Sequence, residues 1–269
     1  MKLINSSVDI VKPNGYTIDD IYRQIELAGR TCYKSEDKIT DTSAKEFVER
    51  MIKSGNNAML EHGTVYLLIL ANSQRLLDYN INKYSKCNYV LSELVLNIIF
   101  VAVTTNYRVL VENNWLDDLQ YLCEPTEYHT KRITAKFICD RGVSHEFVRH
   151  RVFSFAQEST RYCNYSKDKF GNELTFITPS GILEHTSFNE HGGINKYFQS
   201  CEDLYFGLLD QSWYPQEAIA ILPNALKTEL VMTGFEDDWK GFFKLRCAPQ
   251  AHPDARKLAL ELKSEMYGK

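Results

Sequence analysis

The segment from residue 149 to 162 constrains this chain more than any other part of its sequence. It reads Arg-His-Arg-Val-Phe-Ser-Phe-Ala-Gln-Glu-Ser-Thr-Arg-Tyr, which concentrates three arginines and a histidine between apolar residues. Arginine keeps its charge when partly buried, and its planar guanidinium binds phosphate through paired hydrogen bonds. The whole segment therefore indicates a partly buried pocket for an anion. The Arg-His-Arg triplet by itself would more often be a surface cluster beside a core helix.

Composition places the chain among soluble globular proteins. Hydrophobic residues make up 44% of the 269 residues and charged residues 25%, which are ordinary values for that class. A chain of this length can bury a full core as one large domain or as two small ones. The net charge of -4 gives no overall field that would attract nucleic acid. A nucleic-acid partner is therefore not expected, and any anion site must be local.

Cysteine usage and hydropathy bear on the compartment. Seven cysteines are scattered along the chain without a C-x-x-C pair, which predicts reduced thiols and no metal site. The most apolar stretch, residues 89–103, is interrupted by Ser92, Glu93 and Asn97, so it is too short and too polar to span a bilayer. The first residues lack a signal-peptide pattern. We therefore expect a cytoplasmic protein without a membrane partner.

The hydrophobic periodicity predicts helices and strands in mixed order. Apolar residues at helical spacing predict helices over residues 19–28, 43–52, 91–111, 144–151, 196–209, 236–245 and 253–266. Alternating or β-branched runs predict strands over residues 63–70, 133–139, 176–177 and 228–233. The β-branched residues within 91–111 leave a strand open there as well. Because the elements follow no regular βαβ order, the pattern favours an α+β fold.

Two common chemical signatures are missing from the sequence. No G-x-G-x-x-G motif follows a predicted strand, so a dinucleotide would have to be held by side chains rather than by a Rossmann loop. No cysteine lies in a setting typical of a nucleophile. Cys247 follows Arg246, which could lower the pKa of its thiol, but a small buried residue is the more frequent role for such a cysteine.

The segment also carries a family resemblance. Arg149-His150-Arg151 followed by seven residues and Ser159 resembles the RHR-x7-S signature of the flavin-dependent thymidylate synthases. Further matches extend the likeness from about residue 16 to 260; they are Glu61-His62, residues 140–146, Leu222-Pro223-Asn224, Leu245-Arg246 and Ala251-His252-Pro253. The resemblance implies the thymidylate synthase-complementing protein fold. In this fold residues 1–269 form a single mixed α+β domain, with a small sheet flanked by helices.

The resemblance further implies an activity. Members of this family reductively methylate dUMP to dTMP, with methylenetetrahydrofolate as the carbon donor and with FAD and NADPH as the source of electrons. The cofactor carries the difficult chemistry in such enzymes, and the protein positions it. The family also forms homotetramers whose active sites lie between subunits. We therefore expect dUMP and further copies of this chain as partners.

Site residues follow from the resemblance, position by position. Those implied to contact the flavin are His62, Thr64, Arg149, His150, Arg151 and Gln157. Those implied to contact the nucleotide are Glu146, Arg149, Gln157, Glu158, Ser159, Arg161 and Arg246. Arg246 is also the implied catalytic residue, because a fixed charge in a dry pocket favours a deprotonated uracil ring. Without the resemblance, the alternative for Arg246 is a cation at a helix C-terminus that interacts weakly with the helix dipole.

The sequence departs from the family pattern at four positions. Ile219 stands where many members have an arginine, Phe235 and Asp237 replace an Asn-x-Arg sequence, and Gly241 replaces an asparagine. An arginine-to-aspartate change reverses the charge near a diphosphate, so weaker FAD binding is expected. The departures leave two alternatives open. The chain could transfer a one-carbon unit to a different pyrimidine nucleotide, or it could be a nucleotide-binding paralogue without catalysis.

Overall fold

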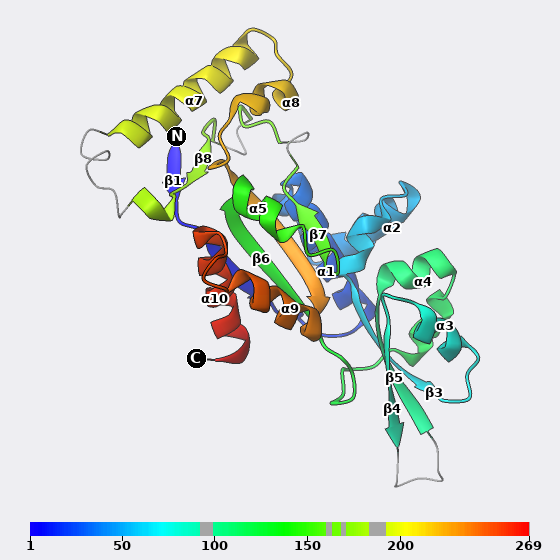
Figure 1. Ribbon diagram of the computed structural model, residues 1–269. Coiled ribbons are helices and arrows are strands. Elements are labelled where there is room, and N and C mark those ends of the chain that lie inside the picture. The colour runs from blue at the N-terminus through cyan, green and yellow to red at the C-terminus, as the bar shows by residue number, and fades with distance from the viewer. Residues whose placement is uncertain (92–98, 160–162, 168–170, 183–191, 269) are drawn as a thin grey trace.

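The computed structural model describes residues 1–91, 99–159, 163–167, 171–182 and 192–268. Helices surround three small sheets in this part of the chain (Figure 1). The predicted α+β class is confirmed, although the described residues form three small sheets where one was expected. None of the described helices has the length and apolar character needed to cross a membrane.

The central sheet holds four antiparallel strands in the order β2-β6-β9-β7, namely β2 Ser7–Val11, β6 Arg132–Asp140, β9 Lys227–Phe235 and β7 Ser154–Gln157. Strands β6 and β9 pair along their whole length. Side chains alternate between the two faces of a strand. Phe137 and Leu230 therefore join one hydrophobic cluster, whereas Ala156 and Val231 join another on the opposite face.

Different helices cover the two faces of this sheet. The first face packs against α5 Arg141–Phe147, α9 Glu236–Arg246 and α10 Pro253–Tyr267, which lie in front of the sheet in Figure 1. Trp239 and Phe242 are fully buried there. The opposite face packs against α1 Ile18–Tyr33, with α2 Ser43–Lys53 beside it. The apolar periodicity of the sequence predicts α2, α9 and α10 within one residue at each end, whereas α1 extends five residues beyond its predicted end.

A second sheet forms an arm that projects from the central sheet (Figure 1). Its strands are β3 Thr64–Leu70, β5 Ile99–Asn106 and β4 Lys86–Leu91, in the order β3-β5-β4, and it carries α3 Arg75–Ile81 and α4 Tyr107–Asn113. The predicted helix over residues 91–111 is therefore wrong for 99–106. The β-branched run there pairs with β3 and β4 on both sides, and a helix begins only at Tyr107. Residues 92–98 lie outside the described residues.

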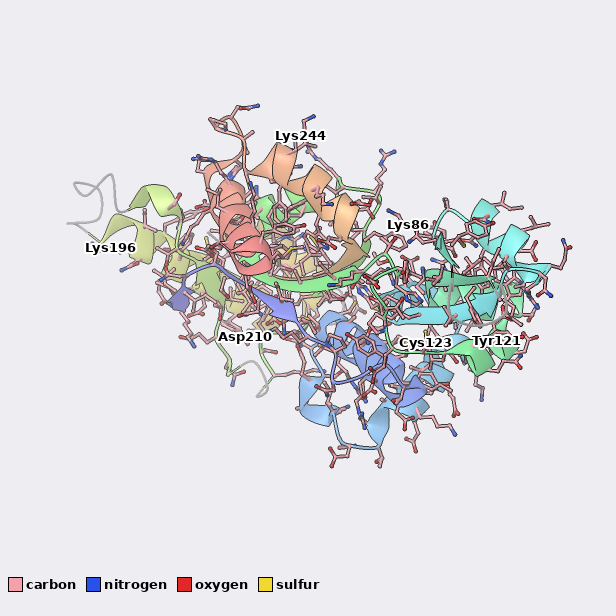
Figure 2. All side chains as sticks on the ribbon, turned by 90° about the horizontal axis from the view of Figure 1, so that it is seen from below. Lys86, Tyr121, Cys123, Lys196, Asp210 and Lys244 are labelled. Carbon is pink, nitrogen blue, oxygen red and sulfur yellow. The ribbon has the colours of Figure 1, made fainter. Side chains whose placement is uncertain are left out.

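The third sheet pairs the start of the chain with a distant segment. β1 Lys2–Ile4 runs parallel to β8 Thr175–Ile177, and α7 Gly193–Asp210 and α8 Pro215–Ala218 lie beside it. Phe176 and Phe198 stack there with ring centroids 4.6 Å apart. Figure 2 shows Lys196 of α7 and Tyr121 of the arm at opposite ends of the molecule. Short 3-10 helices complete the described structure at Glu36–Lys38, Asn57–His62, Leu116–Tyr121, Ser180–Ile182 and Ile219–Ile221.

Helix α5 ends earlier than the sequence predicts. Asp140 caps its first turn by accepting a 2.8 Å hydrogen bond from the backbone amide of Val143. The helix ends at Phe147, and the amide of His150 then donates to the carbonyl of Phe147 in a tight turn. The predicted helix over residues 144–151 is therefore wrong beyond Phe147. As a result, Arg149, His150 and Arg151 lie in turns between α5 and β7 rather than on a helix.

Candidate functional site

The arginine-rich segment of residues 149–162 follows α5 and leads to the edge of the central sheet. Its residues 154–157 form β7, which pairs with β9 so that Ser154 lies opposite Thr233 and Gln157 lies opposite Leu230. Because neighbouring residues of a strand face opposite ways, Ser154 faces α1 and Gln157 faces α5. The motif therefore contributes side chains to both faces of the sheet.

The first group of site residues gathers around Arg246 at the end of α9. Its Nε donates to Nε2 of His150 at 2.9 Å, and its Nη1 donates to Oε2 of Glu146 at 2.5 Å. Its Nη2 donates to the backbone carbonyl of Glu146, also at 2.5 Å. Three residues that the sequence predicts for the site are thus brought together from α5, the following turn and α9. The Arg149 guanidinium lies 3.6 Å from the Glu146 carboxylate and is largely exposed.

These contacts fix the charges of the group. Burial, together with the charge of Arg246, lowers the pKa of His150 to about 4. The hydrogen bond from Arg246 holds the pKa of the Glu146 carboxyl below its usual range. At neutral pH the imidazole is therefore neutral and the carboxylate is ionised. A guanidinium has five N–H donors, and three of them are used here, so two remain for an anionic ligand.

The second group lines a cavity of about 460 Å³ between the motif, the arm and the start of α9. Arg151, Val152, Phe153 and Ser154 form its motif side; the remaining lining residues are Glu61, Lys83, Tyr84, Lys86, Asn106, Arg132, Gly234, Phe235 and Asp238. Consecutive residues of the motif therefore belong to different groups. His150 turns toward Arg246, whereas Arg151 turns toward the cavity.

Arg132 is the central cation of this cavity, and the sequence analysis did not single it out. Its Nη2 donates to the carbonyl of Glu61 at 3.1 Å, and its Nη1 donates to Oγ1 of Thr64 at 3.4 Å. Burial lowers the pKa of this guanidinium to about 10, so it stays charged at neutral pH. The signal that could have revealed it is an arginine directly before the predicted strand of residues 133–139.

His62 and Thr64 do not reach this cavity in the described structure. His62 is 1% exposed, and its Nδ1 lies 2.8 Å from Oγ1 of Thr233 on β9. Thr64 is buried and lines a smaller cavity of about 220 Å³, with Arg132 forming a wall of both cavities. Within one chain, His62 is thus a core residue between the arm and the central sheet. Its predicted contact with a flavin stays a prediction.

The last residues of the motif are held by the protein itself. Nε2 of Gln157 donates to the hydroxyls of Ser144 at 2.9 Å and Thr228 at 3.3 Å. The Glu158 carboxylate accepts hydrogen bonds from Lys227 at 3.0 Å and from the hydroxyl of Tyr165 at 3.3 Å. Both oxygens of Glu158 are therefore engaged, which fits a residue that positions the loop.

The loop is further anchored to α1. The amide of Ser159 donates to the carbonyl of Cys32 at 2.9 Å. Arg161, the predicted phosphate-binding residue, lies outside the described residues. The structure therefore places the start of the predicted nucleotide loop between α1 and β9, and the predicted roles of Ser159 and Arg161 stay predictions.

A buried charge network at the base of this loop was missed by the sequence analysis. Glu229 of β9 is 6% exposed and forms ion pairs with Lys34 at 2.6 Å, with Lys136 at 2.7 Å and with Lys227. Glu36 pairs with Lys34 at 3.0 Å, and Glu158 pairs with Lys227. Lys136 and Glu229 are charged residues inside predicted strands, which is a signal that could have pointed to such a network.

The four departures from the family pattern divide into two pairs. Ile219 is buried in the cluster around α7, and Gly241 is exposed on α9 with open space around it; neither lines the two cavities described above. Phe235 does line the larger cavity. Asp237 is exposed and pairs with Lys240 at 2.9 Å and with Lys86 at 3.4 Å.

Comparison with known proteins identifies the family. The family model described as "Thymidylate synthase complementing protein" matches residues 125–269. The chain belongs to this family. The matched part contains β6, α5, the motif, β9, α9 and α10, and therefore all residues of the Arg246 group.

Curated relatives share about a third of the matched residues. The protein named flavin-dependent thymidylate synthase from Geobacter sulfurreducens is 31% identical over 122 residues, which cover 45% of this chain and 50% of that protein. The protein of the same name from Pyrococcus furiosus is 30% identical over 128 residues, 48% of this chain and 51% of that protein. The chain thus spans about half the length of these relatives.

A solved structure was also found to be similar. This crystal structure, titled as the UMP/dUMP methylase PolB from Streptomyces cacaoi bound with 5-Br UMP, has 13% identity and a TM-score of 0.47, covering 99% of this chain and 91% of that one.

The buried His62 predicts a measurable pH dependence of stability. Burial and the charge of Arg132 lower its pKa to about 3, against about 6.5 in the unfolded chain. Between these values the unfolded state binds more protons, so stability falls as pH drops below about 6.5. His62→Asn keeps a hydrogen-bonding atom for Thr233 but cannot titrate. The slope of unfolding free energy against pH, measured in urea between pH 6.5 and 4, should be shallower in this variant by up to about 1.4 kcal/mol per pH unit.

The matched control is His145→Asn, because His145 is exposed on α5. This variant should keep the slope of the wild-type protein. Equal slopes in the wild-type protein and in His62→Asn would show that the buried imidazole does not have the lowered pKa.

Proposed function

We propose that this chain methylates dUMP reductively to dTMP, with FAD as its bound cofactor. One observation carries the proposal. Arg246, His150 and Glu146 form one hydrogen-bonded group beside the Arg-His-Arg motif, within the residues that match the family. The names of the curated relatives, flavin-dependent thymidylate synthase, support the choice of reaction.

The Arg246 group suits a pyrimidine ring that becomes anionic during the reaction. The two unused N–H donors of Arg246 can bind the ring oxygens, and a charge that is already fixed in place costs no reorganisation when the ring loses its imide proton. His150 is neutral at neutral pH because of its lowered pKa. It therefore orients Arg246 by accepting a hydrogen bond from it, and the positive charge of this pair stays on the arginine.

The cavity beside Arg151 suits a flavin nucleotide. Its lining combines four cationic side chains, those of Lys83, Lys86, Arg132 and Arg151, with the aromatic ring of Phe235. Cations in a partly enclosed cavity favour a diphosphate, and aromatic rings favour a planar ligand. A flavin bound there would, in its reduced form, supply the electrons for the reaction. NADPH as the reductant of the flavin and methylenetetrahydrofolate as the carbon donor complete the proposal.

Assembly into a homotetramer is part of the same proposal. Arg149 is largely exposed, and Val152 is 63% exposed although it is apolar and lies in the motif. A site that is open on this side can be completed by residues of a second copy, and closed symmetric assemblies are the common case for soluble oligomers.

The proposal predicts saturable flavin binding and a specific product. Titration with FAD, followed by flavin fluorescence, should saturate, and the loaded protein should convert dUMP to dTMP when NADPH and methylenetetrahydrofolate are added. Chromatography of the nucleotides measures the product. UMP should be tested in parallel. Faster methylation of UMP would favour a different pyrimidine nucleotide as the substrate. Binding of dUMP without any flavin binding or product would favour a non-catalytic paralogue.

A further inference from the structure

The cavity beside Arg151 has one wall that the family match does not include. The match begins at residue 125, whereas Lys83, Tyr84, Lys86 and Asn106 precede it and belong to the arm. Figure 2 shows Lys86 at the junction between the arm and the rest of the molecule. The cavity therefore combines a motif side within the matched residues with an arm side outside them.

The charges of the cavity are unbalanced. Its four cationic side chains outnumber its two acids, and one of these acids, Glu61, already pairs with Arg108 at 2.5 Å. Among the described residues, no carboxylate lies within ion-pair distance of Lys83, Arg132 or Arg151. Unpaired cations that line a cavity raise the local concentration of anions. The cavity is thus built for a ligand with more than one negative charge.

Lys86 occupies a particular place among these cations. Its Nζ lies 4.7 Å from the centre of the Phe235 ring, and the Arg132 guanidinium lies 5.6 Å from the same centre. Lys86 also reaches Asp237 at 3.4 Å, where Asp237 is more than half exposed. An exposed pair of this kind is weak. Lys86 can therefore turn from Asp237 to a ligand at little cost, while Lys240 stays paired with Asp237 at 2.9 Å.

We propose that the arm is a diphosphate-binding wall, in which Lys83 and Lys86 bind the diphosphate of a flavin dinucleotide. This inference rests on the proposed function, because that function makes FAD the ligand of the cavity. A lysine ammonium acts on phosphate as a mobile point charge. The arm thereby supplies cations to the side of the cavity where α9 begins with Glu236, Asp237 and Asp238. It also offsets the reversed charge at Asp237.

Two flavins that differ only in their phosphates test this assignment. The variants are Lys83→Met, Lys86→Met and the double variant, and the ligands are FAD and uncharged riboflavin, titrated by flavin fluorescence. Loss of charged hydrogen bonds should raise the Kd for FAD by about tenfold or more in the double variant. The Kd for riboflavin should change by less than about twofold, and the salt dependence of FAD binding should become shallower. Lys86→Arg should retain most of the affinity.

Lys244→Met is the matched control, because Lys244 is exposed on α9 and lines neither of the two cavities described above. Its Kd for FAD should equal that of the wild-type protein. If the wild-type protein binds FAD and the double variant binds it equally well, the arm is not a phosphate-binding wall, although the proposed function stands. An equal loss of affinity for FAD and riboflavin would show that the lysines only shape the cavity through Phe235. If the wild-type protein binds neither flavin, both the inference and the proposed function are wrong.

Discussion

Replacement of Arg246 by alanine should lower the turnover of dUMP by about a hundredfold or more, as removal of an oxyanion-stabilising donor does in other enzymes. The guanidinium is held by Glu146 and His150, so its charge is fixed before the substrate binds. If this charge acts mainly on the anionic ring of the transition state, kcat and kcat/KM should fall together. Steady-state kinetics with saturating cofactors measures both quantities.

Two controls separate chemistry from folding in this experiment. Lys244→Ala removes an exposed cation from the same helix and should leave turnover unchanged. Thermal unfolding, followed by circular dichroism, should show that Arg246→Ala remains folded. Turnover at the wild-type rate in Arg246→Ala would show that another residue stabilises the ring.

The same variant has a second readout that does not depend on activity. Burial and the charge of Arg246 lower the pKa of His150 to about 4. Removal of Arg246 deletes the second of these causes, so the pKa of His150 should rise toward its ordinary value. NMR titration of the imidazole in the wild-type protein and in Arg246→Ala measures this shift. An unchanged pKa would mean that burial alone accounts for the neutral histidine.

The predictable part of the site is local in sequence. Arg149, His150 and Arg151 are adjacent, and the sequence shows at once that they form a polar group within an apolar segment. Their division between two groups depends on where α5 ends. The turn after Phe147 sends His150 toward Arg246 and Arg151 toward the cavity. Helix ends depend on capping and tertiary contacts, which periodicity does not contain.

The parts that could not be predicted depend on distant partners. Residues 99–106 are a strand because β3 and β4 are available to pair with them, and apolar β-branched runs do not show by themselves whether such partners exist. His62 is a core residue because Thr233 lies opposite it, 171 residues later. Sequence patterns near His62 contain no information about that contact.

Strand register connects the separate features of the molecule. Lys227, Glu229, Val231, Thr233 and Phe235 alternate along β9, so they share one face of the strand. This face runs from the buried charge network, past the hydrogen bond to His62, to the cavity beside Arg151. A shift of one residue in the pairing of β9 would turn all five side chains away from their partners. The site therefore depends on a register that long-range pairing sets.

The buried charge network makes Glu229 the position with the largest expected effect on stability. Burial alone would raise the pKa of its carboxyl, but the charges and hydrogen bonds of Lys227, Lys136 and Lys34 outweigh that effect and hold the pKa well below its usual range. Glu229→Gln leaves three lysines around a neutral side chain. Breaking a buried ion pair by removing one partner costs about 3–5 kcal/mol, so unfolding in urea at pH 7 should show a loss of that size.

Glu36 offers a matched control for Glu229, because it pairs with two of the same lysines, Lys34 and Lys136, but is considerably more exposed. Glu36→Gln should cost less than about 1 kcal/mol, since solvent screens exposed pairs. The pH dependence gives an independent check. The pKa of Glu229 is lower in the folded chain than in the unfolded chain, so its contribution is present above about pH 4.3 and is lost as the pH falls below that value. The stability difference between the wild-type protein and Glu229→Gln should therefore shrink between pH 4.3 and pH 3. A variant as stable as Glu36→Gln at pH 7 would show that Glu229 does not hold the network together.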